Sequence, residues 1–546
     1  MNLLNNAILR TPKPVNEPIY SYEPGSNERK LLKEALEEMS EILLDIPLVI
    51  GGEEIRTGNT ANVVVPHDHQ KVLASYHKAG EAEVRKAIDA AVNAQSVWQS
   101  MRWEERCAIF LKAADLLATK YRYQINAGAM LCGGKTAFQA EIDAACELID
   151  FLRFNVKYAE QIYQTQPESS PGVWNFVQHR PLEGFVFAVT PFNFTAIAGN
   201  LATAPAIMGN TVVWKPASSL VYTPYLIMRI LEEAGLPPGV INFVPGSGRD
   251  VGDICLADSH LAGVHFTGST PVFQKMWKTI GNNIAKYKSY PRLVGETGGK
   301  DFIFAHSSTD VKEVVTAMVR GAFEYQGQKC SAASRAYIPK SLWPAVEECL
   351  KSEMSKITMG PTTDFRNFVG AVIDKAAFES ITSYITFAKE NEGGDVLIGG
   401  NFDDSTGYFI EPTVILASDP HFKTMVEEIF GPVLTVYVYD DADYEKTLDV
   451  CDSSSMYGLT GAIFSRDRLA TSVALRKLEH AAGNFYINDK PTGAVVGQQP
   501  FGGGRASGTN DKAGAATNLL RWVSPRTVKE TFVPATEFGY PFMEEE

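Results

Sequence analysis

Short apolar stretches alternate with helix-like stretches between residues 185 and 266, and this alternation constrains the fold more than any other feature of the chain. The predicted strands are 185–189, 211–214, 241–244 and 263–266, and the predicted helices between them are 195–209, 224–235 and 250–257. Near-continuous apolar strands of this length are typical of a parallel sheet that crossover helices bury on both faces. The chain is therefore predicted to have an α/β fold with a doubly wound, Rossmann-type sheet.

The flanking sequence predicts a second α/β segment and a helical scaffold. From about 301 to 480 the alternation resumes, with helices near 310–325, 341–356 and 375–391 and strands near 334–338, 413–417 and 433–438. Upstream, charge and apolar spacing predict helices near 27–42, 81–98, 104–120 and 137–164. The tail after Gly508 is too short to bury a core, so we expect it to pair with another subunit or an edge strand.

The composition excludes several classes of function. The 546 residues are 45% hydrophobic and 21% charged, as in ordinary globular proteins, and the formal charge is -14. An acidic chain without basic patches argues against a nucleic-acid partner or an anionic membrane surface, so we expect small-molecule ligands. The seven cysteines lack Cys-x-x-Cys spacing, which indicates neither a disulfide framework nor a zinc site and suits a reducing compartment. No metal is expected.

Residues 184–214 contain no Asp, Glu, Lys or Arg, which raises the question of a membrane span. Prolines and asparagines interrupt this segment, so a buried strand, loop, helix and strand explain it better. The first fifteen residues hold only Arg10 and Lys13 as cations and show no apolar core before a small-residue cleavage site. Neither a secretory signal nor a transit peptide is predicted. The expected location is the cytoplasm, with the mitochondrial matrix as the alternative.

Cys330 and Glu296 carry the clearest chemical signal. Most lone cysteines are inert core residues, but Cys330 lies in Gly-Gln-Lys-Cys-Ser, which predicts a polar, flexible turn where the adjacent Lys329 favours the thiolate. Glu296 alone would be read as a solvated charge, yet it follows an apolar strand and precedes Gly298 and Gly299, where backbone can approach a ligand. Such a thiol and carboxylate can attack an aldehyde carbon and then hydrolyse the thioester.

Six motifs occur in the order found in one known family. They are Thr-Pro-Phe-Asn-Phe-Thr (190–195), Trp-Lys-Pro-Ala-Ser (214–218), Phe-Thr-Gly-Ser-Thr (266–270), Glu-Thr-Gly-Gly-Lys (296–300), Gly-Gln-Lys-Cys-Ser (327–331) and Glu-Glu-Ile-Phe-Gly-Pro (427–432). On these motifs the chain resembles the aldehyde dehydrogenases. Segments 140–155, 482–490 and 497–510 resemble the L-glutamate gamma-semialdehyde (1-pyrroline-5-carboxylate) dehydrogenase branch.

The resemblance implies an activity, namely NAD-dependent oxidation of L-glutamate gamma-semialdehyde to L-glutamate, the second step of proline degradation. The reaction would pass through a thiohemiacetal and a thioester on Cys330. Two alternatives remain open. The chain could act on another semialdehyde, or it could be a catalytically silent protein of the same fold.

The resemblance also assigns catalytic and cofactor-binding roles. Cys330 would be the nucleophile, Glu296 would activate the hydrolytic water, and the Asn193 amide would join the Cys330 N–H in holding the oxyanion. The implied NAD-binding residues are Thr190, Lys215, Gly268, Ser269, Thr270, Glu428 and Phe430. Ser218 stands where many relatives carry Glu for the ribose 2′-hydroxyl, which leaves NADP open. Phe273 replaces a glycine of many relatives, so we expect the diphosphate to approach differently.

For the substrate, the resemblance places Glu147 opposite the α-ammonium group, although its helix position alone would suggest a surface carboxylate. The other implied contacts are Ser331, Gly493 and Ala494 with the α-carboxylate, and Phe194 and Phe501 with the aliphatic chain. Ala494 departs from the serine that relatives often carry, which removes one side-chain hydrogen bond.

The implied architecture combines a NAD-binding domain, an α/β catalytic domain and a small oligomerisation flap. The expected boundaries are 1–45 for an N-terminal arm, 46–164 with 183–300 for the NAD-binding domain, 301–490 for the catalytic domain, and 165–182 with 510–546 for oligomerisation elements. We expect a homodimer or a higher homo-oligomer.

Overall fold

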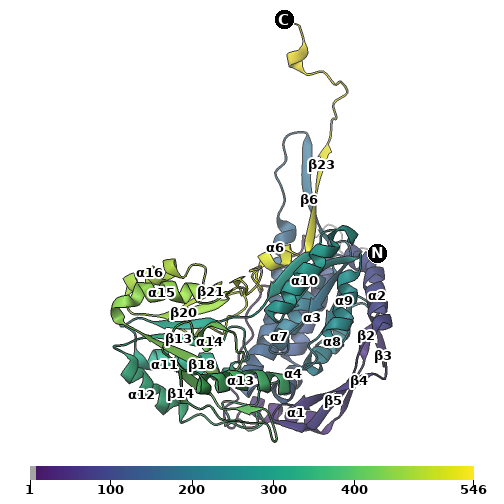
Figure 1. Ribbon diagram of the computed structural model, residues 1–546. Helices are drawn as coiled ribbons and strands as arrows, with labels where there is room; N and C mark the ends of the chain where they lie inside the picture. Colours follow the sequence, from purple (N-terminus) through teal and green to yellow (C-terminus); the bar gives the residue numbers. More distant parts are fainter. Residues whose placement is uncertain (1–7, 546) are drawn as a thin grey trace.

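The computed structural model describes residues 8–545, which form two lobes and a narrow two-stranded arm that projects from one of them (Figure 1). The first lobe is built on a seven-stranded sheet with the order β11-β10-β7-β8-β9-β2-β3. These strands span Arg292–Glu296, Leu261–Thr267, Phe185–Val189, Thr211–Lys215, Ile241–Phe243, Leu48–Ile50 and Glu53–Ile55. The first five are parallel, whereas β2 and β3 are antiparallel. The predicted doubly wound sheet is confirmed.

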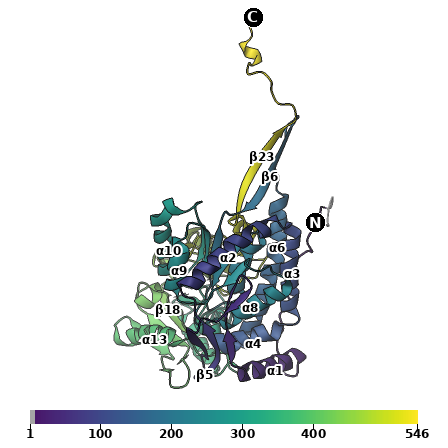
Figure 2. The same ribbon diagram turned by 90° about the vertical axis from the view of Figure 1, so that its right-hand side faces the viewer.

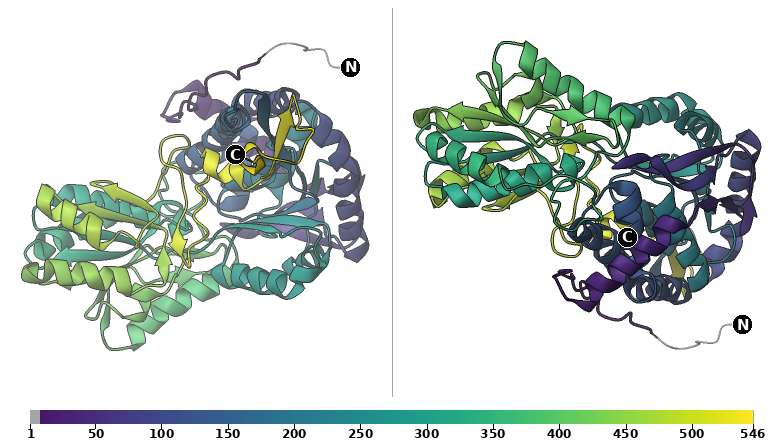
Figure 3. Two further views of the ribbon diagram at one scale, coloured as in Figure 1. Left: turned by 90° about the horizontal axis from the view of Figure 1, so that it is seen from above. Right: turned by 90° about the horizontal axis from the view of Figure 1, so that it is seen from below.

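Helices cover both faces of this sheet (Figure 3). They are α2 (Glu81–Ser100), α7 (Thr195–Ile207), α8 (Tyr222–Ala234), α9 (Gly248–Ala257) and α10 (Thr270–Asn283). Along β7, Val186 and Ala188 belong to the core that includes α7 and α8, whereas Phe185 and Phe187 belong to the core that includes α2, α9 and α10. Alternate side chains of one strand thus fill two cores, which explains the continuous apolar runs in the sequence.

The order of the strands creates a crevice at one edge of the sheet. The chain runs from β7 outward to β8 and β9, and then returns to the other side of β7 for β10 and β11. At such a switch point the loops that leave neighbouring strands diverge and leave room for a ligand. The loops after β7 and β10 therefore bound the first candidate site.

The second lobe repeats the layered design around a seven-stranded sheet with the order β14-β17-β18-β13-β12-β20-β21. Its strands span Gly394–Ile398, Thr413–Ala417, Val433–Tyr439, Ala333–Pro339, Asp301–Ala305, Thr460–Phe464 and Asn484–Ile487. Its longest helices are α11 (Val311–Phe323), α12 (Trp343–Met354) and α13 (Lys375–Glu390). The helices and strands predicted for this part of the sequence are confirmed within a few residues.

The helix predicted over 137–164 contains an irregularity that the sequence did not show. It consists of α5 (Ala137–Ala140), a π-helix (Glu141–Glu147) and α6 (Leu148–Gln164). The wider turn of a π-helix rotates the following side chains relative to a regular helix and is frequent at functional sites. Here it buries Glu141 and Asp143 and ends at Glu147.

The projecting arm is a two-stranded antiparallel sheet of β6 (Val173–Pro181) and β23 (Val523–Thr531) (Figure 2). The tail therefore pairs with an edge strand of its own chain, which was one of the two expected outcomes. Both Trp174 and Phe532 are more than half exposed. The assignment of 165–182 and 510–546 to oligomerisation stays a prediction.

Residues 491–509 were assigned to none of the predicted domains and connect the lobes. Gly504–Arg505 pairs with Tyr457–Gly458 of the second lobe, and Gly508 forms a bridge with Glu296 at the end of β11.

At the other end of the chain, α1 (Asn27–Glu41) packs against α4 (Arg122–Gly133). Residues 1–7, part of the segment searched for a targeting signal, and residue 546 lie outside the described residues. No helix within 8–545 is long and apolar enough to cross a membrane.

Candidate active site

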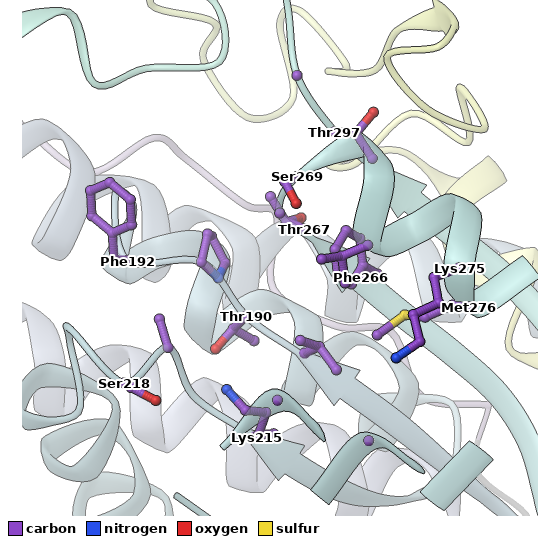
Figure 4. Close-up of a pocket in the computed structure, with 18 of the residues that line it drawn as sticks. Thr190, Phe192, Lys215, Ser218, Phe266, Thr267, Ser269, Lys275, Met276 and Thr297 are labelled. Atoms are coloured by element: carbon purple, nitrogen blue, oxygen red, sulfur yellow. The ribbon is translucent and has the colours of Figure 1, made fainter. Parts of the chain in front are cut away.

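A cavity of about 670 Å³ opens at the switch point, and we call it the sheet-edge cavity. Six of the seven residues predicted to bind the cofactor line it: Thr190, Lys215, Gly268, Ser269, Glu428 and Phe430. Figure 4 shows Lys215 and Ser218 on one side of this space and Ser269, Lys275 and Met276 on the other. The loops after β8 and β10 thus face each other across a volume that suits a cofactor.

The chemistry of this cavity fits a dinucleotide. Ser269 is the N-cap of α10, where Pro271 has no N–H and the Val272 N–H donates to the Ser269 carbonyl, so the Thr270 N–H and the Ser269 hydroxyl are the groups that can meet phosphate oxygens. A Cβ at Gly268 would lie 2.7 Å from the Phe266 ring, so a side chain there would crowd the turn. Lys215 is 7% exposed and makes no ion pair within residues 8–545, and burial lowers its pKa to about 8. Its Nζ donates only to the Pro216 carbonyl at 3.0 Å, which leaves donors for a ligand.

Thr270 and Phe273 do not lie where the sequence suggested. Thr270 is buried outside the lining of the sheet-edge cavity, where its hydroxyl accepts from the Gly298 N–H at 3.4 Å. Phe273 is also absent from the lining, because its ring stacks on Phe266 at 5.3 Å beneath the sheet. The expectation that Phe273 alters the approach of the diphosphate stays a prediction.

Glu428 and Phe430 come from the second lobe and close the inner end of the sheet-edge cavity. Glu428 accepts a hydrogen bond from the Gly299 N–H at 2.9 Å, and burial raises its pKa to about 7. Phe430 has a φ of 57°, which is strained for an aromatic residue, and its ring meets Phe192 edge-on at 5.9 Å. Strain of this kind persists only where the surrounding packing imposes it.

The turn that carries Cys330 is buried and rigid, which corrects the prediction of a flexible turn. Tyr325 and Gln326 adopt positive φ values of 52° and 55°. The Gln326 side chain donates to the carbonyls of Gly134 and Ala371, each at 2.8 Å, and accepts from the Gly370 N–H at 3.1 Å. The glutamine side chains tie this turn to neighbouring backbone groups. Their presence in the sequence therefore does not mean that the turn faces water.

The electrostatic surroundings of Cys330 also differ from the prediction. Lys329 is buried, and its Nζ lies 3.3 Å from the Glu324 carboxylate. Burial, followed by the nearby carboxyl groups of Asp301, Glu296 and Glu428, raises the pKa of the Cys330 thiol well above its usual range. Lys329 pairs with Glu324, and the charges nearest the thiol are carboxyl groups that oppose its ionisation, so the expectation that Lys329 favours the thiolate has no support in this structure.

Asn193 and Glu296 approach the Cys330 turn in different ways. The Asn193 side chain lines the sheet-edge cavity and donates to the Gln328 carbonyl at 3.1 Å. Glu296 ends β11, as predicted, but its carboxylate accepts from the Gly503 N–H at 3.2 Å and lines neither cavity described here. Burial raises the pKa of Glu296 well above its usual range. The structure thus brings Asn193 and Cys330 to one cavity and holds Glu296 behind them.

A second cavity of about 670 Å³ lies between the π-helix and the loop that follows β21, and we call it the π-helix cavity. All six residues predicted to bind the substrate line it: Glu147, Phe194, Ser331, Gly493, Ala494 and Phe501. Burial and the neighbouring Asp143 raise the pKa of Glu147 well above its usual range. Because Glu147 lines this cavity, the alternative that it is an ordinary surface carboxylate is wrong. Cys330 lines both cavities and lies where they meet.

Comparison with known proteins agrees with this geometry. The model of the aldehyde dehydrogenase family matches residues 55–528. The chain belongs to the aldehyde dehydrogenase family. It is 57% identical over 535 residues to the mitochondrial delta-1-pyrroline-5-carboxylate dehydrogenase of Dictyostelium discoideum, covering 97% of this chain and 96% of that protein. The mitochondrial enzyme of that name from Homo sapiens is 49% identical over 533 residues, with 97% and 95% covered.

Solved structures place this aldehyde dehydrogenase in the same group. The crystal structure of the delta-pyrroline-5-carboxylate dehydrogenase from Mycobacterium tuberculosis bound with NAD has a TM-score of 0.96 and 52% sequence identity, covering 99% of this chain and 100% of that one. A Thermus 1-pyrroline-5-carboxylate dehydrogenase with bound NAD has a TM-score of 0.90 and 34% identity, covering 96% and 100%. Both matches extend over nearly the whole chain.

The sequence of this aldehyde dehydrogenase did not reveal a buried ion pair behind the π-helix cavity. Lys135 Nζ lies 3.1 Å from the Asp143 carboxylate, and both side chains are almost completely buried. Asp143 accepts from the N–H groups of Thr195 and Ala196, at the start of α7. Lys135 lies 4.5 Å from the centre of the Phe194 ring. The pair supports the wall that Phe194 forms, and no local pattern joins residues 135 and 195.

Proposed function

We propose that this chain oxidises L-glutamate gamma-semialdehyde to L-glutamate with NAD as the hydride acceptor. The observation that carries the proposal is the position of Cys330, which lies where the sheet-edge cavity meets the π-helix cavity. A thiol at this junction can reach an aldehyde carbon in one cavity while the cofactor occupies the other. The names of the relatives from D. discoideum, H. sapiens and M. tuberculosis support the same reaction.

NAD would occupy the sheet-edge cavity, with Lys215 near the adenosine ribose, the start of α10 at the diphosphate, and Glu428 at the nicotinamide ribose. When bound, NAD supplies the acceptor for the hydride that leaves the aldehyde carbon. The structures of the M. tuberculosis and Thermus relatives contain bound NAD, which supports this choice. Ser218 lines the cavity and carries no negative charge, so it presents no electrostatic barrier to the 2′-phosphate of NADP.

The first chemical step belongs to Cys330. Its thiol loses a proton, and the thiolate attacks the aldehyde carbon to form a thiohemiacetal. The Asn193 amide and the Cys330 N–H would then hold the oxyanion. Burial and three carboxyl groups raise the pKa of the thiol. Binding of the cofactor and substrate must therefore promote the loss of the thiol proton. Departure of the hydride leaves a thioester on Cys330.

Hydrolysis of the thioester belongs to Glu296. Its carboxylate must leave the Gly503 N–H and turn toward Cys330, where it takes a proton from the attacking water. The C–S bond then breaks and the thiol is restored. The raised pKa of Glu296 makes it a stronger base than an exposed carboxylate once it is ionised.

The far end of the π-helix cavity would select an amino acid. Glu147 would face the α-ammonium group, and Ser331 with the N–H groups of Gly493 and Ala494 would hold the α-carboxylate. Ser331 shares a hydrogen bond of 2.8 Å with Thr492, which fixes its hydroxyl beside this loop. Ala494 offers only its backbone, so the carboxylate would depend on N–H donors.

Two further properties belong to this proposal. The unpaired edges of β6 and β23, with exposed apolar side chains at Trp174 and just after β23 at Phe532, suit a homodimer or higher homo-oligomer in which the projecting arm meets another subunit. The relatives from D. discoideum and H. sapiens bear the word mitochondrial in their names. We therefore favour the mitochondrial matrix over the cytoplasm.

Steady-state formation of NADH from pyrroline-5-carboxylate tests the proposal. We expect turnover with wild-type protein and none with Cys330→Ala, because the thioester cannot form. A parallel assay with succinate semialdehyde, and with NADP in place of NAD, separates a broader semialdehyde dehydrogenase from the proposed enzyme. Labelling of Cys330 with a thiol reagent should slow when NAD and substrate are present. Wild-type-like NADH formation by Cys330→Ala would refute the mechanism.

A further inference from the structure

The N-terminal arm forms part of the wall of the π-helix cavity. Asn16, Glu17 and Ile19 line the cavity together with residues from α6 and from the loop 493–499. These three residues lie more than 300 positions before Cys330 in the sequence. A segment expected to serve only as a peripheral arm is therefore part of the site.

Asn16 connects two elements that carry proposed substrate contacts. Its Nδ2 donates to the Asp150 carboxylate of α6 at 2.7 Å and to the Val496 carbonyl at 2.8 Å. Its Oδ1 accepts from the Gln498 side chain at 3.0 Å. One amide thus links the helix that follows Glu147 to the loop that begins at Gly493.

The loop 493–499 depends on such contacts because it contains no helix or strand. Val496 is 6% exposed and anchors the loop in the core, but Gly493, Gly497 and Gln498 are exposed. Within the loop, the Val495 N–H donates to the Gln499 side chain at 3.0 Å. The loop also packs on α6 directly, since the backbone of Gly497 lies against the Phe154 ring, and Asn16 adds a hydrogen-bonded link between the two elements.

The N-terminal arm is itself firmly held, so it can position the loop 493–499. The Glu17 N–H donates to Asp150 at 2.7 Å. The Glu17 carboxylate pairs with Arg122 at 2.5 Å and with Arg153 at 2.6 Å, and Arg122 is almost completely buried. Buried charge-assisted contacts of this kind are among the stronger hydrogen bonds in proteins.

We propose that Asn16 is a positioning residue that sets the selectivity of the enzyme for amino-acid aldehydes. It does so by holding the Gly493 and Ala494 N–H groups at a fixed distance from Glu147, so that the α-carboxylate and α-ammonium groups are bound together. The inference rests on the proposed function, because it concerns the far end of the same substrate. It adds a determinant from a part of the chain with no contact to the reacting carbon.

The test compares Asn16→Ala with Thr11→Ala. Thr11 lies on the same N-terminal arm and lines neither cavity, and both its N–H, at 2.8 Å, and its hydroxyl donate to Glu160 of α6; Thr11→Ala removes only the hydroxyl bond. For Asn16→Ala we expect the KM for glutamate semialdehyde to rise about tenfold, as for the loss of one or two hydrogen bonds, with kcat little changed. The KM for NAD and the kcat/KM for propanal should stay at wild-type values. Thr11→Ala should leave all four quantities unchanged.

Hydrogen exchange gives an independent measurement. The amides of residues 493–499 should exchange faster in Asn16→Ala, whereas those of the Cys330 turn should not. Equal losses with glutamate semialdehyde and propanal would show that Asn16 only supports the fold, and unchanged kinetics or exchange would also refute its positioning role. If wild-type protein oxidised propanal but not glutamate semialdehyde, the proposed function would fail, and the selectivity assigned to Asn16 with it.

Discussion

The roles of Cys330 and Glu296 can be separated by one isosteric substitution, Glu296→Gln. Glutamine keeps an oxygen that can accept the Gly503 N–H, as Glu296 does at 3.2 Å, so the resting geometry is preserved. It cannot take a proton from water. A positioned general base typically contributes about 10²- to 10⁴-fold to a rate, and the steady-state rate should fall by that factor.

The first turnover should survive the same substitution. Glu296 is one of three carboxyl groups that raise the pKa of the Cys330 thiol. Removing its charge lowers that pKa, so the thiolate forms at least as readily as in the wild type. Rapid mixing of Glu296→Gln with NAD and glutamate semialdehyde should give a burst of NADH equal to the concentration of active sites, followed by slow turnover. The assay is repeated over a range of pH, because the raised pKa of Glu296 shifts the ionisation of the wild-type base toward higher pH.

Glu428→Gln provides the matched control. Glu428 also raises the pKa of Cys330, but it lines the sheet-edge cavity and accepts from Gly299. Its loss should raise the KM for NAD without separating the burst from the steady state. A steady-state rate for Glu296→Gln within about tenfold of the wild type would contradict the assignment of the base. If the burst and the steady-state turnover were both lost in Glu296→Gln, Glu296 would be needed for the first step, the attack of Cys330 on the aldehyde.

Two predictions concern stability. A Cβ at Gly295 would lie 2.2 Å from the Phe273 ring, so Gly295→Ala should cost about 1–3 kcal/mol and lower the thermal midpoint. Adding Phe273→Leu should recover most of that loss, and no recovery would show that the clash is not the cause. Burial lowers the pKa of His265 to about 3, below its ordinary 6.5, so the folded state binds fewer protons than the unfolded state. The stability that His265 contributes is present above pH 6.5 and is lost as the pH falls toward 3. The urea midpoint of His265→Gln should therefore fall less steeply than that of the wild type as the pH is lowered. Parallel acid profiles for the two proteins would contradict this reasoning.

Much of the fold could be predicted because burial on both faces is recorded locally in the sequence. The strands β7, β8, β9 and β10 and their helices follow from short apolar runs separated by helical periods. The site residues near strand ends, such as Lys215 and Glu296, followed from the same logic, since the ends of parallel strands meet at one edge. The predicted contribution of Lys329 failed, because its side chain turns to Glu324 and away from the thiol.

The sequence by itself determined the layered α/β architecture and the residues with chemical potential, because these depend on local periodicity and on side-chain type. Only the tertiary structure decided which of them share a cavity. It placed Thr270 outside the sheet-edge cavity, set Glu147 on the wall of the π-helix cavity at the end of a π-helix, and brought Asn16 to the loop that follows Gly493. These outcomes depend on how elements distant in the chain pack against one another, and no local pattern records that packing.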